Sequence, residues 1–205
     1  MSTRKGTAVF LSDILDEARD RMMEKMQQTA TTKVSADEFE TTADILAISA
    51  VFINDLKNKK TRNYDFSWEK TLKNEGDSGI RLQYTHARLS NLIANNSNLT
   101  LPSTQAEVEQ LNIELLSEPE AANLILTIAQ FEECLAESYE HLEPSMLVKY
   151  LFKLCKDTSK ALKVLQVKDN ENEETAILRL TLFSVTKNIL GYSMRILGLQ
   201  PLDKM

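Results

Sequence analysis

Apolar residues recur at every third or fourth position along nearly all of this 205-residue chain, and that period limits its possible folds more than any other feature. Side chains at this spacing share one face of an α-helix, and no strand-like alternation persists beyond a few residues. The period predicts an all-α protein of about seven to nine helices. The main stripes are Ile14, Ala18, Met22 and Met26; Phe39, Ala43, Leu46, Ala50 and Ile53; Val108, Leu111 and Leu115; and Leu178, Leu182, Val185, Ile189 and Met194.

A few residues mark where these helices begin and end. Pro144 suits the first turn of a helix, and Gly198 suits the position just after one, where φ is positive. The polar segments 57–66 and 95–103 are predicted loops that separate a front part from a helical bundle. Three pairs of a hydroxyl residue and a glutamate three positions later predict capping boxes: Ser35 with Glu38, Thr104 with Glu107, and Ser117 with Glu120.

Composition argues against several classes of protein. Hydrophobic residues make up 42% and charged residues 26%, which is typical of a globular domain. No stretch approaches the ~20 apolar residues that cross a bilayer, so no membrane partner is expected, and residues 1–10 show no secretory or transit peptide. We expect Cys134 and Cys155 to be buried or half-buried free thiols in a reducing compartment. With only two histidines, no metal site is predicted.

Charge is segregated along the chain, although the net charge is only −6 at pH 7. Residues 103–142 contain nine glutamates and no basic residue, whereas a lysine stripe follows. Within one helix the lysines would occupy an arc of roughly 80°, opposite an apolar stripe. Two interpretations stay open: a solvated outer face, or a surface for a polyanion that relieves the repulsion between like charges. The stripe consists of Lys149, Lys153, Lys156, Lys160 and Lys163.

A second basic cluster lies in residues 79–88, which read GIRLQYTHAR. As a helix, this segment places Arg81, Tyr84 and Arg88 on one face. An aromatic ring between guanidinium groups is the combination that stacks an unpaired base and holds its phosphates. The alternative is that Tyr84 is a core residue with its hydroxyl at the rim. The acidic total argues against indiscriminate nucleic-acid binding, and no DNA partner is expected.

Four ordered motifs resemble one known family. Residues 65–89 (DFSWEKTLKNEGDSGIRLQYTHARL) resemble the segment that opens the DALR-type anticodon-binding domain of arginyl-tRNA synthetases. Residues 1–10 (MSTRKGTAVF) are similar to that family's variant of the class I KMSKS loop, residues 118–154 to its middle helices, and residues 195–205 (RILGLQPLDKM) to its ending. Residues 158–167 and the acidic break after them look most like the mitochondrial branch.

The resemblance implies a DALR-type helical bundle at residues 35–205, preceded at 1–34 by a remnant of the phosphate loop and a connecting helix. It implies binding to the anticodon stem and loop of tRNA(Arg), within a class I enzyme that charges this tRNA with arginine using ATP. Tyr84 and Arg88 would meet anticodon-loop nucleotides, and Met205 would close the same pocket. The loop that covers the ATP phosphates would comprise Met1, Ser2, Thr3, Arg4 and Lys5.

This chain departs from the family pattern at several positions. The family usually has Pro-Tyr where this chain has Ile80 and Arg81, so a charge replaces one stacking ring. Residues 158–162 lack the aromatics usual there, and Thr3 and Arg4 stand where the class I signature would have its second lysine. RNA recognition is therefore expected to rest more on lysines and less on stacking.

The sequence contains no HIGH signature, Walker motif or nucleophile–base arrangement on which independent chemistry could depend. We therefore expect a C-terminal fragment or truncated product of a synthetase, inactive alone and without a cofactor of its own. Its partners would be tRNA(Arg) and the missing N-terminal catalytic domain, and the chain would be a monomer. The resemblance implies the mitochondrion, with the cytoplasm as the alternative. A second hypothesis is a non-catalytic helical interaction protein.

Overall fold

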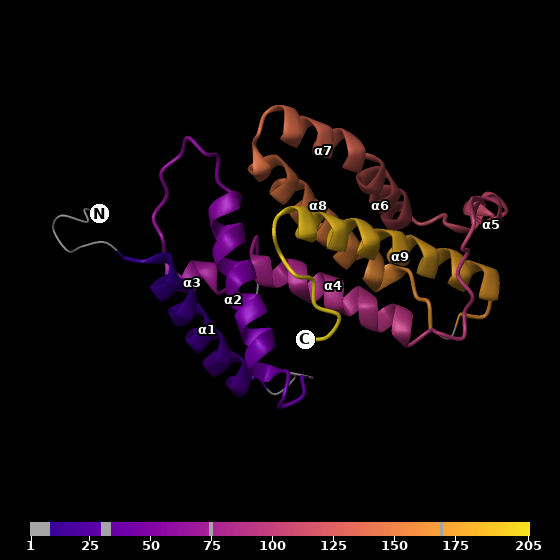
Figure 1. Ribbon diagram of the computed structural model, residues 1–205. Coiled ribbons are helices and arrows are strands. Elements are labelled where there is room, and N and C mark those ends of the chain that lie inside the picture. Colours follow the sequence, from indigo (N-terminus) through magenta and orange to yellow (C-terminus); the bar gives the residue numbers. More distant parts are fainter. Residues whose placement is uncertain (1–8, 30–33, 74–75, 169) are drawn as a thin grey trace.

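A computed structural model describes residues 9–29, 34–73, 76–168 and 170–205, and within them the chain forms nine α-helices, one 3₁₀-helix and no strand (Figure 1). The prediction of an all-α protein is confirmed. Residues 1–8, which include the predicted ATP-loop remnant from Met1 to Lys5, lie outside the described ranges. The elements are α1 (Leu11–Gln28), α2 (Phe39–Leu56), α3 (Trp68–Thr71), α4 (Gly79–Ala94), α5 (Gln105–Glu109), η2 (Ile113–Leu115), α6 (Pro119–Ala129), α7 (Phe131–Glu140), α8 (Pro144–Val164) and α9 (Glu173–Ile196).

Two hydrophobic cores meet at α4, which runs between the α1–α2 pair and the bundle of α6 to α9 (Figure 1). The smaller core is formed mainly by α1 and α2 and includes Ile80 of α4. The larger core is formed mainly by α4, α6, α8 and α9 and includes Leu82 and Leu89. Because α4 contributes to both cores, its position fixes how the front part and the bundle are joined.

Helix α8 has the amphipathic character that the lysine stripe predicts. It begins with Pro144 in its first turn, as expected. All five lysines of the stripe are exposed. The apolar side packs into the larger core through Leu147, Leu151, Leu154, Ala161 and Leu165, each at most 2% exposed.

The end of α9 confirms the role predicted for Gly198, which has a φ of +80°. Its N–H donates to the Arg195 carbonyl at 3.0 Å, and the next N–H, of Leu199, donates to the Met194 carbonyl at 2.8 Å. This pair of bonds is a Schellman motif, which ends the helix and satisfies carbonyls of its last turn.

Of the three predicted capping boxes, one is confirmed and two are wrong. Thr104 and Glu107 form the reciprocal pair of bonds at the start of α5. Ser35 bonds to the Glu38 side chain at 2.9 Å, but only within a turn, since α2 begins at Phe39. Ser117 caps nothing, because the next helix begins at Pro119, at N1, with Glu118 as its N-cap. Glu118 instead forms an ion pair with Arg179 of α9.

The predicted stripe of Val108, Leu111 and Leu115 is wrong as a single helical face. Helix α5 stops at Glu109, and Val108 is 44% exposed. The Asn112 side chain accepts a bond from the Glu114 N–H at 3.3 Å and starts the separate turn η2. A side chain that bonds its own backbone competes with helix continuation, which explains the break.

Both cysteines are free thiols, and Cys155 is buried while Cys134 is half-buried, as predicted. Burial raises the pKa of the Cys155 thiol to about 11, so it stays protonated at neutral pH. In the described ranges no helix combines the length and apolar character needed to span a bilayer. The same ranges hold no group of three His, Cys, Asp or Glu residues placed to bind a metal ion.

Helices α2 and α4 lie close together at Gly79, the first residue of α4. A Cβ atom at this position would lie 2.0 Å from the Ser49 carbonyl oxygen, which is backbone and cannot turn aside. The absence of a side chain at Gly79 therefore sets how closely the two helices approach.

We expect Gly79→Ala to lower the free energy of unfolding by about 3 kcal/mol, because the added methyl group separates two packed helices. Helix propensity alone predicts the opposite, a gain of about 1 kcal/mol. Denaturant unfolding of the chain measures the difference. Asn91→Ala, at an exposed position of the same helix, is the control and should change stability by less than about 0.5 kcal/mol. A Gly79→Ala variant as stable as the parent would contradict the close approach.

Candidate nucleic-acid interface

The exposed strip of α4 contains the three residues that the sequence places on one face. Ser78 caps the helix by accepting a bond from the Arg81 N–H at 3.3 Å. Arg81 is half-buried and Arg88 is exposed. Tyr84 is 53% exposed, so the alternative that it is a core residue is wrong. In the described part of the chain, Tyr84 and Arg88 make no side-chain hydrogen bond or ion pair, which leaves both groups open to a partner.

The C-terminal half of α8 runs beside this strip. The charge of Arg81 acts on the Cys155 thiol of α8. Farther along, Arg88 lines a hollow of about 450 Å³ together with Leu162 and Lys168. Lys156, Lys160 and Lys163 belong to this same half of α8, on the exposed face of the helix opposite its apolar side.

The five lysines of α8 differ in how far other residues engage them. Lys153 donates to the Thr127 hydroxyl at 2.8 Å and to the Gln130 side-chain oxygen at 3.0 Å. Lys160 lies 3.6 Å from the Asp157 carboxylate. Lys149, Lys156 and Lys163 have no such partner within the described ranges. These three ammonium groups are therefore the ones most available to an anion.

Gln83 holds the C-terminal segment against α4. Its side chain is fully buried, and its amide nitrogen donates to the Gln200 carbonyl and to the Ser49 hydroxyl, both at 2.8 Å. Its side-chain oxygen accepts the Leu202 N–H at 2.9 Å. One amide thus joins α2, α4 and the C-terminal segment, and all three of its bonds are satisfied away from water.

Two further side chains of α4 hold the same segment, which we call the tail (residues 199–205). The Nδ1 atom of His86 lies 2.8 Å from the Leu202 carbonyl oxygen. The Ser90 hydroxyl donates to the Asp203 carboxylate at 2.7 Å. Burial lowers the pKa of His86, so its ring is neutral at neutral pH and Nδ1 carries the proton that it donates.

These bonds place Met205, the last predicted site residue. It is half-buried against the smaller core, to which Ile80, one turn before Tyr84, also belongs. Sequence analysis did not identify Gln83, His86 or Ser90. These three polar residues follow the spacing i, i+3 and i+7 on the face of α4 away from Tyr84, and that spacing was the available signal. Their partners in the tail lie more than 110 positions away in the sequence, so the spacing alone does not identify them.

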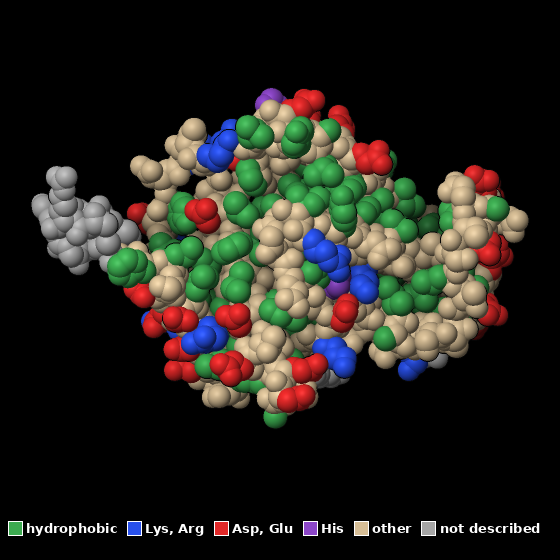
Figure 2. Space-filling model, in the orientation of Figure 1, with side chains coloured by type: hydrophobic (Ala, Val, Ile, Leu, Met, Phe, Trp, Pro, Cys, Tyr) green, Lys and Arg blue, Asp and Glu red, His purple; other side chains and the backbone are tan. Residues whose placement is uncertain are grey.

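The face drawn in Figure 2 carries acidic side chains over α1 and α2, over α5 and α7, and one beside the basic groups at its centre. These Lys and Arg side chains lie over α9 and the tail. This distribution agrees with the segregation of charge along the sequence.

Two family models match the chain. The model described as DALR anticodon binding domain matches residues 82–205. The model described as tRNA synthetases class I (R), catalytic domain, matches residues 1–68.

Relatives match over the whole chain. It is 43% identical to the probable cytoplasmic arginine–tRNA ligase of Dictyostelium discoideum, 38% to the mitochondrial arginine–tRNA ligase of Saccharomyces cerevisiae and 34% to the probable mitochondrial arginine–tRNA ligase of Homo sapiens. These matches cover 100% of this chain and 33%, 31% and 34% of the relatives, so the chain spans about a third of their length. The solved arginyl-tRNA synthetase of Thermus thermophilus has the same fold, with a TM-score of 0.81 at 22% identity over 97% of this chain and 32% of its own.

We expect Gln83→Leu to release the tail, since it removes three hydrogen bonds and leaves buried partners unpaired. The free energy of unfolding should fall by about 1–3 kcal/mol, and the Leu202 amide should exchange its hydrogen at least about tenfold faster. Hydrogen exchange followed by NMR measures both effects. Thr85→Val is the matched control, because the Thr85 hydroxyl bonds the Arg81 carbonyl within α4 and does not reach the tail. Unchanged exchange at Leu202 in Gln83→Leu would show that the tail is held by other contacts.

Proposed function

Because this chain belongs to the family of DALR anticodon-binding domains, we propose that it binds the anticodon stem and loop of tRNA(Arg). The single observation that carries the proposal is the strip of α4 on which Tyr84 is exposed between Arg81 and Arg88. An exposed ring stacks an unpaired base of any kind, and guanidinium and ammonium groups hold the phosphates on either side of it.

Each predicted group has a separate task in this proposal. The Tyr84 ring stacks a base of the anticodon loop, and Arg88 contacts a neighbouring phosphate. Arg81 supplies a charge where the family usually has a second ring, so this end of the site attracts a phosphate and does not stack a base. Lys149, Lys153, Lys156, Lys160 and Lys163 attract the anticodon stem, and Met205, held near α4 by the tail, closes the pocket against the loop.

The whole protein to which this region corresponds would be a class I enzyme that charges tRNA(Arg) with arginine using ATP. The names of the relatives and the class I match at residues 1–68 support this proposal. Residues 1–34 would be the remnant of the phosphate loop and connecting helix, with Met1 to Lys5 over the ATP phosphates, and residues 35–205 the anticodon-binding domain. The chain would act as a monomer, with no cofactor of its own and no activity without the catalytic domain.

We also propose a mitochondrial location, with the cytoplasm as the alternative. The resemblance of residues 158–167 to the mitochondrial branch supports the first. The relatives include arginine–tRNA ligases named for each compartment.

We expect Tyr84→Ala to weaken binding of an arginine anticodon stem–loop by about 1–3 kcal/mol, the usual contribution of one stacked base. Thermal stability should stay the same, because the ring is largely exposed. Fluorescence anisotropy with a labelled RNA hairpin measures the affinity. Tyr139→Ala is the matched control, since Tyr139 is 78% exposed on α7, away from the strip. If a hairpin of random loop sequence binds equally well and Tyr84→Ala changes nothing, the interaction-protein hypothesis is favoured.

The salt dependence of RNA binding tests the lysines separately. With about five phosphates neutralised, log K should fall against log salt with a slope near −3 to −5. The double change Lys156→Gln and Lys163→Gln should reduce that slope by about 1–2, because neither ammonium group has a partner in the part of the chain that the structure describes. Lys153→Gln should reduce it less, since this lysine already bonds Thr127 and Gln130. Equal slopes for the parent and the double variant would favour the interpretation that the lysine stripe of α8 is only a solvated outer face.

A further inference from the structure

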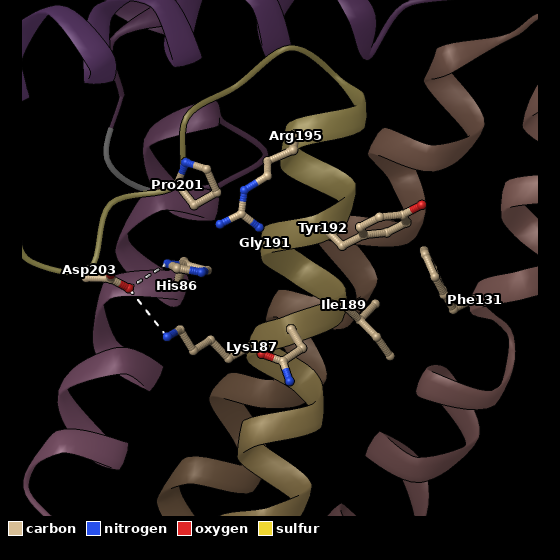
Figure 3. A pocket seen from close by; sticks show the side chains of 10 residues that line it. His86, Phe131, Lys187, Ile189, Gly191, Tyr192, Arg195, Pro201 and Asp203 are labelled. Carbon is tan, nitrogen blue, oxygen red and sulfur yellow. Dashed lines mark ion pairs between the residues drawn. The ribbon is translucent and has the colours of Figure 1, made fainter.

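A hollow of about 510 Å³ lies between α4, α9 and the tail (Figure 3). Its lining includes His86 from α4, Lys187 and Arg195 from α9, and Asp203 from the tail. The side chains of these four residues point toward one another in Figure 3. His86 and Tyr84 are two positions apart, which turns them by about 200° around the helix axis. The hollow is therefore separate from the proposed anticodon site.

The charge inside the hollow is not balanced. Lys187 lies 3.5 Å from the Asp203 carboxylate, which already accepts the Ser90 hydroxyl at 2.7 Å. Arg195, which is exposed, makes no hydrogen bond or ion pair with any residue in the described ranges. Two cations thus lie near one carboxylate, of which only Lys187 pairs with it, while the Arg195 guanidinium has no hydrogen-bond or ion-pair partner in the described ranges. Figure 2 shows Lys and Arg side chains gathered beside a histidine at this place on the surface.

Gly191 keeps the floor of the hollow open. A Cβ atom there would lie 2.8 Å from Nε2 of His86 and 3.5 Å from Nη1 of Arg195. Without a side chain at this position, the imidazole and the guanidinium can both lie against the same turn of α9. The Tyr192 ring, 56% exposed, also lines the hollow but points away from His86 and toward Phe131, with 6.3 Å between the two ring centroids (Figure 3).

We infer that this hollow is a second anion site, which binds a phosphate group carried by a nucleotide. Arg195 presents a planar fork of donors that fits two phosphate oxygens, and Lys187 supplies a second positive charge. The exposed face of Tyr192 offers a stacking surface for the attached base. The volume lies within the usual range for small-molecule sites, about 300–1,000 Å³. The phosphate belongs either to a free mononucleotide or to a phosphodiester of single-stranded RNA.

The experiment is an NMR titration of the ¹⁵N-labelled 205-residue chain with adenosine 5′-monophosphate, with a five-nucleotide oligoadenylate and with adenosine. Both phosphate-bearing probes should shift the amide signals of residues 187–195, and adenosine at equal concentration should not. Tighter binding of the mononucleotide identifies a free nucleotide as the ligand, and tighter binding of the oligonucleotide identifies RNA.

Arg195→Gln should weaken binding of the monophosphate at least about tenfold, the usual effect of losing a charge-assisted hydrogen bond. Lys187→Gln is the second variant, and Arg88→Gln is the matched control that removes a cation from the other side of α4. Since Arg195 is exposed, its variant should keep the fold, which the amide spectrum checks. Absence of shifts at millimolar monophosphate, or parent-like binding by both variants, would overturn the inference.

This result is independent of the proposed function. Tyr84→Ala and Arg88→Gln should weaken binding of the anticodon hairpin and leave binding of the monophosphate unchanged. Arg195→Gln should weaken binding of the monophosphate and leave binding of the hairpin unchanged. Failure of either proposal can therefore be recognised while the other stands.

Discussion

Burial of α4 on three sides is the constraint on which the rest of the molecule depends. Its residues supply Ile80 to one core and Leu82 and Leu89 to the other, so a shift of this helix would disturb both. The close contact of Gly79 with the Ser49 carbonyl fixes how near the start of α4 lies to α2. What remains exposed is a single strip through Tyr84 and Arg88. The availability of this strip to a ligand is thus a consequence of how the two cores are joined.

Local pattern predicts most of this fold, because helices depend on short-range periodicity. The apolar and lysine faces of α8 and the Schellman end at Gly198 all follow from residues within two turns of one another. The failures also have local causes. Pro119 at N1 gives the N-cap to Glu118 rather than Ser117, and the Asn112 side chain ends the stripe that begins at Val108. A motif of two residues cannot show which of several neighbouring polar groups becomes the cap.

The site was only partly predictable, for a different reason. The strip of Arg81, Tyr84 and Arg88 lies on one helix and can be found by counting. The bonds of Gln83 and His86 to the tail join residues more than 110 positions apart, and no periodicity contains that information. Likewise, a row of lysines looks uniform in the sequence. Only the structure shows that Lys153 is held by Thr127 and Gln130, while Lys156 has no partner among the described residues.

Helix α4 carries two sets of residues with the same spacing. Arg81, Tyr84 and Arg88 follow i, i+3 and i+7, as do Gln83, His86 and Ser90, displaced by two positions. Two positions correspond to about 200° of rotation, so one set faces outward and the other holds the tail. Because a packed helix moves as a rigid body, the tail is positioned relative to Tyr84 by the helix that presents Tyr84. The tail, and Met205 with it, is therefore ordered by α4 before any ligand arrives, and none of a ligand's binding energy is spent on ordering it.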